Sequence, residues 1–159
     1  MNLRPYTPAD FPALYAIEEI CFQPPQRFSR SYMRQILSSS TSAAWIAEAE
    51  GRMAGFAIVD WSREPGPSIK TDQTLAYIQT IEVLPDFRGR GLGRELLDRL
   101  EQSAIAAGAI IIWLHVDEEN HAALHLYQDS GYLCRGRQEN YYGRNRAALI
   151  FAKPLEVAA

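Results

Sequence analysis

The sequence has few cysteines, no excess of positive charge and no long apolar run. Cys21 and Cys134 are the only cysteines among 159 residues, and without Cys-x-x-Cys spacing they predict reduced thiols in a cytoplasmic protein. The formal net charge of −3 argues against general binding to nucleic acid. The longest apolar run, residues 104–116, is too short to span a bilayer, and the first residues lack the apolar stretch of a secretory signal. We therefore expect neither a nucleic-acid partner nor a membrane segment.

The order of predicted elements indicates an α/β protein. The length suits a single domain over residues 1–159. Thr7 and Pro8 mark a first helix start, and Ser29 or Ser31 marks a second. Two apolar runs around residues 50–52 predict an antiparallel hairpin, and residues 62–74 predict a surface loop. Further strands are predicted at 1–4, 75–83, 109–116, 132–137 and 147–155, and further helices after residue 91 and at 120–130. Because hairpins come first and strands then alternate with helices, we expect a mixed sheet flanked by helices.

A turn with three glycines in five residues precedes the predicted helix after residue 91. A helix start exposes unpaired N–H groups at the positive end of its dipole, and glycine lets an anion approach without meeting a Cβ. Arginines surround these glycines and add positive charge. The turn therefore predicts a site for a phosphate or pyrophosphate, with the candidate residues Arg88, Gly89, Arg90, Gly91, Leu92, Gly93 and Arg94.

Three known phosphate-binding turns can be compared with this one. The phosphate loop of nucleotide hydrolases ends in Gly-Lys-Ser/Thr, and the chain has no such run. The dinucleotide pattern G-x-G-x-x-G fails because Arg94 stands where the third glycine is needed. The pattern Arg-x-x-Gly-x-Gly fits Arg88, Gly91 and Gly93. The alternative that needs no ligand is a glycine-rich loop with solvated arginines.

This pattern resembles the acetyl-CoA-binding turn of the GCN5-related N-acetyltransferase (GNAT) superfamily. A second block, residues 120–132, resembles that family's N-x-x-A-x-x-L-Y-x-x-x-G-F segment, with Tyr132 in place of the usual phenylalanine. The resemblance covers nearly the whole chain and implies the GNAT fold, with a mostly antiparallel sheet of about seven strands. It also implies that acetyl-CoA is the cofactor. Backbone groups of Ile81 and Val83, together with Asn120, would bind the pantetheine arm, and the Val83 amide would polarise the thioester.

Within the superfamily the chain looks most like the RimI-like and other N-terminal amine acetyltransferases. Tyr141 and Tyr142 resemble the paired tyrosines that cover a peptide's N-terminus in that group, and four residues match its substrate loop: Phe22, Pro24, Pro25 and Phe28. The resemblance implies a protein or peptide α-amine as acceptor and a monomer or homodimer. Two alternatives stay open. An acidic, open cleft would favour a small amine such as a polyamine, amino acid or drug, and tight acetyl-CoA binding without turnover would favour a non-catalytic sensor.

Four residues are candidates for the proton transfers of acetyl transfer to an amine. Tyr127 occupies the motif position of the family's general acid, and its phenol is protonated at neutral pH. RimI-like enzymes carry glutamate where this chain has His115. A eukaryotic branch with histidine there also has tyrosine at the position of Tyr77, which implies that these two hold a water that deprotonates the amine. Glu82 is the rival base. It faces away from Tyr77 on simple strand alternation, and a bulge would reverse that.

His121 and His125 are one helical turn apart, which is a spacing that zinc ligands use. No third ligand is predicted on the same helix face. Surface or cap positions explain both histidines, so we expect no metal site.

Overall fold

The structure is a computed structural model that describes residues 1–63 and 73–156. Most of the loop predicted at residues 62–74 lies outside the described residues. The strands are β1 Asn2–Pro5, β2 Ser42–Ala49, β3 Arg52–Ser62, β4 Thr74–Val83, β5 Ala109–Asp117, β6 Leu133–Gln138 and β7 Ala148–Pro154. The helices are α1 Phe11–Cys21, α2 Arg30–Ser38, α3 Leu92–Ala106 and α4 His121–Asp129, with 3-10 turns at Pro8–Asp10 and Pro85–Phe87. These elements match the predicted order.

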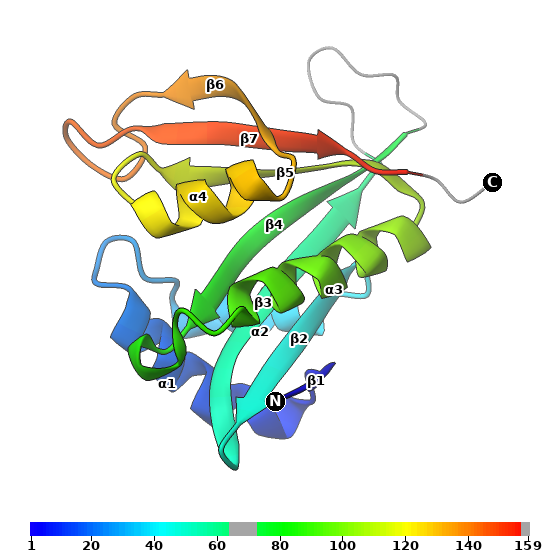
Figure 1. Ribbon diagram of the computed structural model, residues 1–159, viewed down its shortest axis with the longest axis vertical. Coiled ribbons are helices and arrows are strands. Elements are labelled where there is room, and N and C mark those ends of the chain that lie inside the picture. The colour runs from blue at the N-terminus through cyan, green and yellow to red at the C-terminus, as the bar shows by residue number, and fades with distance from the viewer. Residues whose placement is uncertain (64–72, 157–159) are drawn as a thin grey trace.

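The described strands form one mixed sheet with the order β1-β2-β3-β4-β5-β7-β6 (Figure 1). Only β4 and β5 pair in parallel, and every other neighbouring pair is antiparallel. The predicted α/β fold with a mostly antiparallel sheet is therefore confirmed. Helix α3 crosses from β4 to β5 over one face, as a parallel connection requires.

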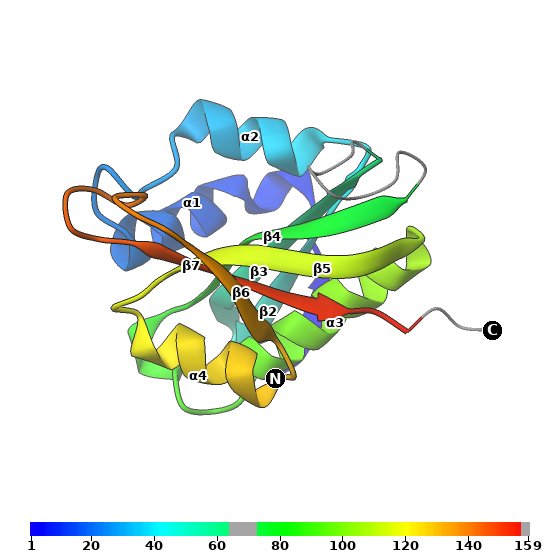
Figure 2. The same ribbon diagram turned by 90° about the horizontal axis from the view of Figure 1, so that it is seen from above.

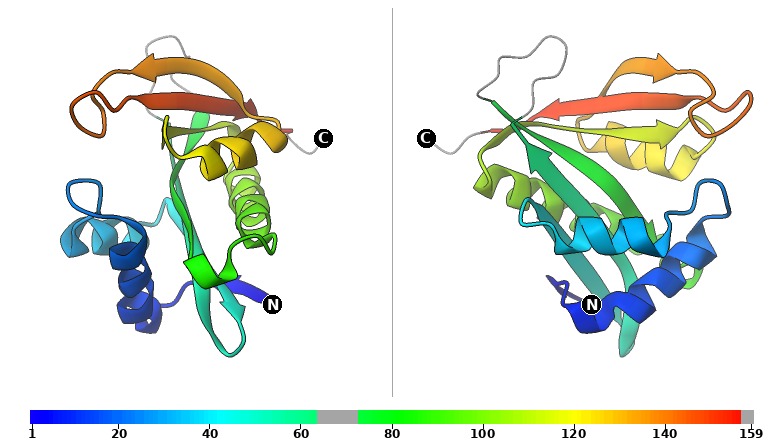
Figure 3. Two further views of the ribbon diagram at one scale, coloured as in Figure 1. Left: turned by 60° about the vertical axis from the view of Figure 1, so that its left-hand side comes forward. Right: turned by 180° about the vertical axis from the view of Figure 1, so that it is seen from behind.

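The helices cover both faces of the sheet (Figure 3). Helices α3 and α4 pack on one face around Leu96, Leu97 and Tyr127, and helices α1 and α2 pack on the other around Phe11 and Met33. In the described part of the chain, no helix has the length and apolar character needed to cross a membrane.

Local capping explains where the 3-10 turn before α1 and helix α2 begin. The Thr7 amide donates to the Asp10 carboxylate at 2.8 Å, and Arg4 forms two hydrogen bonds of 2.8 Å to the same carboxylate. The hydrogen bond from Arg4 is the main reason that the pKa of Asp10 is lowered to about 2. Of the two serines predicted to start α2, Ser29 is the cap, because its hydroxyl accepts from the Tyr32 amide at 3.1 Å.

A bulge in β4 changes which side chains face the same side of the sheet. Ile58 pairs with Thr80, and the next residue, Val59, pairs with Ile78, so Gln79 is an extra residue in β4. Beyond this bulge Glu82 reaches Glu18 of α1, while Ile81 packs into the core around α3. Glu82 therefore lies on the face covered by α1 and α2, as the sequence predicted for a bulged strand.

The sheet opens between its two parallel strands. Pairing of β4 with β5 runs only from Thr74–Ala109 to Tyr77–Trp113, whereas β5 stays paired with β7 as far as Asp117. After Tyr77 the two strands diverge, as Figures 1 and 2 show. Backbone groups along the separated ends are left to face a gap at the carboxyl ends of two parallel strands, where α/β proteins commonly bind ligands.

Candidate active site

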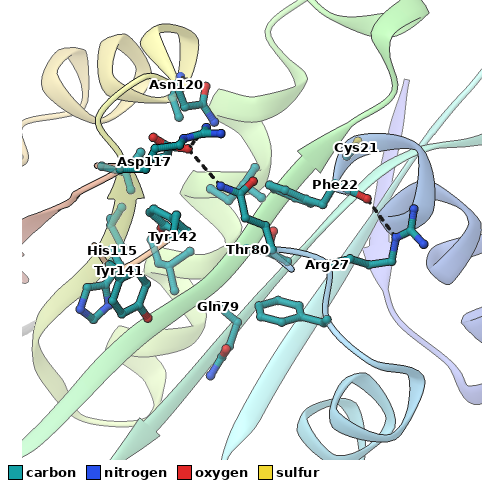
Figure 4. Close-up of a pocket in the computed structure, with 18 of the residues that line it drawn as sticks. Cys21, Phe22, Arg27, Gln79, Thr80, His115, Asp117, Asn120, Tyr141 and Tyr142 are labelled. Atoms are coloured by element: carbon teal, nitrogen blue, oxygen red, sulfur yellow. Dashed lines mark hydrogen bonds and ion pairs between the residues drawn. The ribbon is translucent and has the colours of Figure 1, made fainter. Parts of the chain in front are cut away.

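A cavity of about 910 Å³ occupies this opening. Residues 78–81 of β4 and 114–117 of β5 form its two sides. Residues 25–28, the start of α4 and residues 140–143 supply much of the remaining wall. Figure 4 shows side chains from these segments pointing toward a common space. Three segments that are distant in sequence, two loops and the start of α4, thus meet where the sheet opens.

The glycine-rich turn forms the start of α3. Gly91 is the N-cap residue and has a left-handed backbone with φ of 84°, which a side chain makes costly. The first hydrogen bond of the helix runs from the Glu95 amide to the Gly91 carbonyl at 3.1 Å. The amides of residues 92–94 therefore have no acceptor within the helix. This geometry fits the phosphate cradle that the sequence predicted, since the open amides lie at the positive end of a 15-residue helix.

The three arginines of the turn contact protein groups. Arg88 Nε donates to the Val83 carbonyl at 2.8 Å. Arg90 Nη1 lies 3.2 Å from Glu50 Oε1, and Arg94 Nε lies 4.0 Å from Asp98 Oδ1. Residues 88–94 are not among those that line the cavity, so the turn forms a separate, open surface beside it.

Tyr127 lies in the wall of the cavity on α4, with only 5% of its surface exposed. Helix α4 begins at the predicted residue, because the Asn120 side chain accepts from the Ala123 amide at 3.2 Å. Burial raises the pKa of Tyr127 above its ordinary value, so the phenol is protonated at neutral pH. The nearby Tyr132 packs edge-on against it and donates its hydroxyl to Glu101 at 2.7 Å.

His115 and Tyr77 meet at the narrow end of the opening. The Tyr77 hydroxyl lies 2.8 Å from His115 Nδ1, just beyond the last β4–β5 pair. Burial lowers the pKa of His115, and burial raises the pKa of Tyr77. At neutral pH the imidazole is therefore uncharged, and the tautomer that carries its proton on Nε2 accepts from the hydroxyl at Nδ1. The Tyr141 ring stacks on His115 at 4.4 Å between ring centroids and shields this hydrogen bond from solvent on one side.

Glu82 is 3% exposed and does not line the cavity. Its Oε2 accepts from the Thr80 hydroxyl at 2.8 Å, and its carboxyl lies beside that of Glu18. Burial, followed by the contact with Glu18, raises the pKa of Glu82 well above its ordinary value. The sequence prediction missed Glu18. Its spacing from Leu14 and Ile17 on the apolar face of α1 was the one signal that a buried acid was present.

All but one of the residues predicted to bind the acetyl acceptor line the cavity. Phe22, Pro25 and Phe28 line it, and Pro24 does not. Tyr141 and Tyr142 line the opposite wall and pack edge-on, with ring centroids 4.8 Å apart.

The sequence prediction also missed a polar chain at the bulge. The Tyr32 hydroxyl donates to Gln79 Oε1 at 3.0 Å, and Gln79 Nε2 donates to Asp60 Oδ2 at 2.6 Å. Tyr32 and Gln79 line the cavity. Nothing in the sequence around residue 79 marks it as the extra residue, because a bulge is defined by the partner strand as well.

Acidic residues at the end of β5 hold the two acceptor segments together. Asp117 accepts from Gln26 at 3.2 Å and forms an ion pair with Arg146. Figure 4 shows Asp117 of β5 across the opening from Phe22 and Arg27. Glu118 accepts from Arg137 at 3.0 Å, so the ends of the segment that carries the paired tyrosines are both fixed to this acidic turn.

The two helix-spaced histidines lie on the surface. His121 and His125 are exposed, and His125 Nε2 lies 3.4 Å from Asp129. Within residues 1–63 and 73–156, no three histidine, cysteine or acidic side chains come together in a way that would hold a metal ion.

Comparisons with known proteins identify the family. A model of the Acetyltransferase (GNAT) family matches residues 11–132. The ribosomal protein bS18-alanine N-acetyltransferase of Escherichia coli strain K12 is 30% identical over 93% of both chains, and that of Salmonella typhimurium strain LT2 is 34% identical over 69% of both. The crystal structure of Arabidopsis thaliana NAA60 with a bisubstrate analogue matches with a TM-score of 0.85, at 21% identity over 99% of both chains. The chain therefore belongs to the GNAT family of acetyltransferases, which use acetyl-CoA as acetyl donor.

Proposed function

We propose that this enzyme acetylates the N-terminal α-amine of a protein or peptide. The observation that carries the proposal is the cavity at the opening of β4 and β5, which holds the Tyr77–His115 pair and the buried Tyr127 in one space. The relatives at 30% and 34% identity act on the N-terminal alanine of a ribosomal protein, and this supports the same class of acceptor here. We further propose that the enzyme acts in the cytoplasm, as a monomer or homodimer.

The chain offers groups that fit each part of acetyl-CoA. The open amides of residues 92–94 would bind the pyrophosphate, with the arginines of the turn adding positive charge. Backbone groups of Ile81 and Val83 and the Asn120 side chain would bind the pantetheine arm. When bound, acetyl-CoA supplies an acetyl thioester, and the remaining chemistry belongs to side chains of this enzyme.

Tyr77 and His115 are the proposed route for the proton that leaves the amine. A free α-amine has a reference pKa of about 7.7–8.0, against about 10.4 for lysine, so a weak base is sufficient. A water that takes the proton from the ammonium would pass one to the Tyr77 oxygen as Tyr77 gives its own to His115 Nδ1. The uncharged state of His115 supports this role. Glu82 is the less suitable base because it does not line the cavity, and burial followed by its contact with Glu18 raises its pKa well above the ordinary value.

Tyr127 is the proposed acid. Its phenol would give a proton to the sulfur atom as the carbon–sulfur bond breaks, which avoids release of a free thiolate in a partly closed site. The raised pKa of Tyr127 supports this assignment, since the group is fully protonated before the reaction.

The walls of the cavity support an extended peptide as acceptor. Phe22, Pro25 and Phe28 form an apolar wall suited to the first side chain, and Tyr141 and Tyr142 face it. The N-terminus would enter between these walls and place its nitrogen near Tyr77.

A thiol-release assay with acetyl-CoA tests the proposal. The acceptors are a peptide that begins with alanine, the same peptide with a blocked N-terminus and an internal lysine, and a set of polyamines. We expect turnover with the free N-terminus at least about tenfold faster than with the others. Turnover with lysine or polyamines alone would refute the α-amine assignment, and acetyl-CoA binding without any turnover would indicate a sensor.

A further inference from the structure

Two acidic side chains are buried against each other between α1 and β4. Glu18 is 0% exposed and Glu82 is 3% exposed, and the Glu18 carboxyl is close enough to that of Glu82 to raise its pKa. The Oε1 atom of each is buried and has no hydrogen-bond partner among the described residues. Two touching carboxylates cannot both be ionised in such a place, and one proton between the two Oε1 atoms satisfies both.

The charged groups around this pair leave it with a single negative charge. Helix α1 contributes Cys21, and burial raises the pKa of that thiol to about 11, so it is neutral. The turn after β4 contributes Arg88, whose guanidinium lies 3.7 Å from the Cys21 sulfur and donates to the Val83 carbonyl. The remaining polar neighbour on β4 is the Thr80 hydroxyl. One positive charge at the edge of the pair fits one carboxylate and one carboxylic acid.

The pair connects the acceptor segment to the strand that carries the cofactor-binding backbone. Glu18 Oε2 accepts from the Phe28 amide at 3.1 Å, and the Phe28 carbonyl accepts from the Tyr15 hydroxyl at 2.7 Å. Phe28 lines the cavity, and so does Glu18. Glu82 lies between Ile81 and Val83. Movement of the Glu18 carboxylate would therefore remove one of the two hydrogen bonds that hold the backbone of residue 28 over the cavity.

We propose that Glu18 and Glu82 are positioning residues, and that one shared proton fixes the Glu18 carboxylate so that it holds the Phe28 amide and the acceptor wall in place. The Glu82 hydroxyl donates to Glu18, which makes a charge-assisted hydrogen bond of the strong class. Without that donor, the buried Glu18 carboxylate would keep only the hydrogen bond from the Phe28 amide, and its lowest-energy response is to turn into the cavity toward water. The Phe28 amide would then lose its acceptor.

Hydrogen exchange of the Phe28 amide, measured by NMR, tests this without any substrate. Glu82→Gln keeps a donor to Glu18 and cannot titrate, so we expect protection of Phe28 within about twofold of wild type. Glu82→Leu keeps the size but removes the donor, and we expect at least a tenfold loss of protection. Glu19→Gln, an exposed neighbour on α1, is the matched control and should change nothing. If Glu82→Leu folds poorly, Glu18→Gln/Glu82→Leu removes the buried charge and should recover most of the protection.

The pH dependence of Phe28 protection shows whether the amide is held by a shared proton or by packing alone. In the wild type, protection of Phe28 corrected for intrinsic exchange should fall as pH rises and the shared proton is lost. In Glu82→Gln it should stay constant. Equal pH dependence in the two proteins, or a Glu82→Leu protein with wild-type protection, would overturn the proposal.

A kinetic measurement extends the test and rests on the proposed function. With a peptide that begins with alanine, Glu82→Leu should raise the peptide KM about tenfold and leave the acetyl-CoA KM within twofold. Glu82→Gln should restore the peptide KM. An equal loss of affinity for both substrates would contradict a role specific to the acceptor wall. If no peptide reacts with the wild type, the proposed function fails while the exchange experiment still decides the role of the pair.

Discussion

The Tyr127 hydroxyl has a close structural counterpart in the Tyr132 hydroxyl, and the two can be tested side by side. Both rings are buried, and they pack edge-on with centroids 5.5 Å apart. Tyr127→Phe removes the proposed acid, so we expect kcat to fall about 100-fold or more with little change in acetyl-CoA affinity. Steady-state kinetics with the reacting peptide, and calorimetry with acetyl-CoA, measure the two quantities.

Tyr132→Phe serves as the control because it removes a hydroxyl that binds Glu101 outside the cavity. It should lower the free energy of unfolding by about 1–3 kcal/mol, as loss of a hydrogen bond to a charged group does, and leave kcat within about threefold. Unchanged turnover in Tyr127→Phe would remove that residue from the mechanism.

His115 should set the acidic limit of activity. Burial lowers its pKa below the ordinary value of about 6.5, so the imidazole is uncharged over a wider range on the acidic side. Activity that needs this uncharged form is lost only as pH falls through the lowered pKa. In His115→Ala we expect activity to begin at a higher pH, because only the fraction of acceptor already deprotonated can react. The pH profile of kcat/KM measures this, and a profile identical to wild type would place the base at Glu82 or in solvent.

At the residue scale, the sequence predicted the residues that a motif or a family pattern marks. The family pattern pairs Tyr77 with His115 as residues that hold a water, and the structure brings these two side chains into direct contact although they are 38 positions apart. Glu18 and Gln79 carry no motif. Their importance comes from partners on other elements, so a single sequence shows only an acid on an apolar helix face and an unremarkable strand residue.

Helix α3 begins and ends with glycines in the same backbone conformation. Gly91 has φ of 84° and Gly108 has φ of 86°, and an added Cβ at either would meet no atom within 4 Å. Each substitution by alanine should therefore destabilise the protein by a similar amount, about 1–2 kcal/mol, from backbone strain alone. Only Gly91 lies at the helix start whose amides are proposed to bind the pyrophosphate.

The paired variants therefore separate strain from ligand binding. Gly91→Ala should weaken acetyl-CoA binding at least tenfold in calorimetry, and Gly108→Ala should bind within about twofold of wild type. Chemical denaturation measures whether their stabilities match, as the equal φ angles require. Equal acetyl-CoA affinities in the two variants would show that the turn does not form the cradle.

At the element scale, helices and strands were predictable because capping and periodicity are local. Ser29, Asn120 and the glycines act within a few residues of their own position. The sequence analysis stated only which way Glu82 would face if β4 contained a bulge. The position of the bulge could not be predicted, because it depends on how β3 pairs with β4. The acidic turn at the end of β5 was not assigned, because each of its acids depends on an arginine 19–29 residues away.

At the scale of the whole molecule, the sheet is two parts that share few backbone pairs. Strands β1–β4 and strands β5–β7 meet only along the pairs from Thr74–Ala109 to Tyr77–Trp113. The sequence predicted a mixed sheet, because hairpins precede the alternating elements. The pattern of apolar residues does not show where β4 and β5 stop pairing, because that point depends on contacts between elements that are distant in sequence.

A ligand that binds in the opening should therefore connect the two parts of the sheet and raise the melting temperature. At a concentration of 100 times its Kd, any ligand specific to the folded state adds about 2.7 kcal/mol. For a protein of this size, each kcal/mol raises Tm by roughly 2–4 °C, so acetyl-CoA should raise Tm by about 5–11 °C. Differential scanning fluorimetry measures the shift. Acetyl-pantetheine at the same concentration keeps the arm and lacks the pyrophosphate, so it should give less than a third of that shift. Equal shifts from the two compounds would mean that the strands, and not the start of α3, supply most of the binding energy.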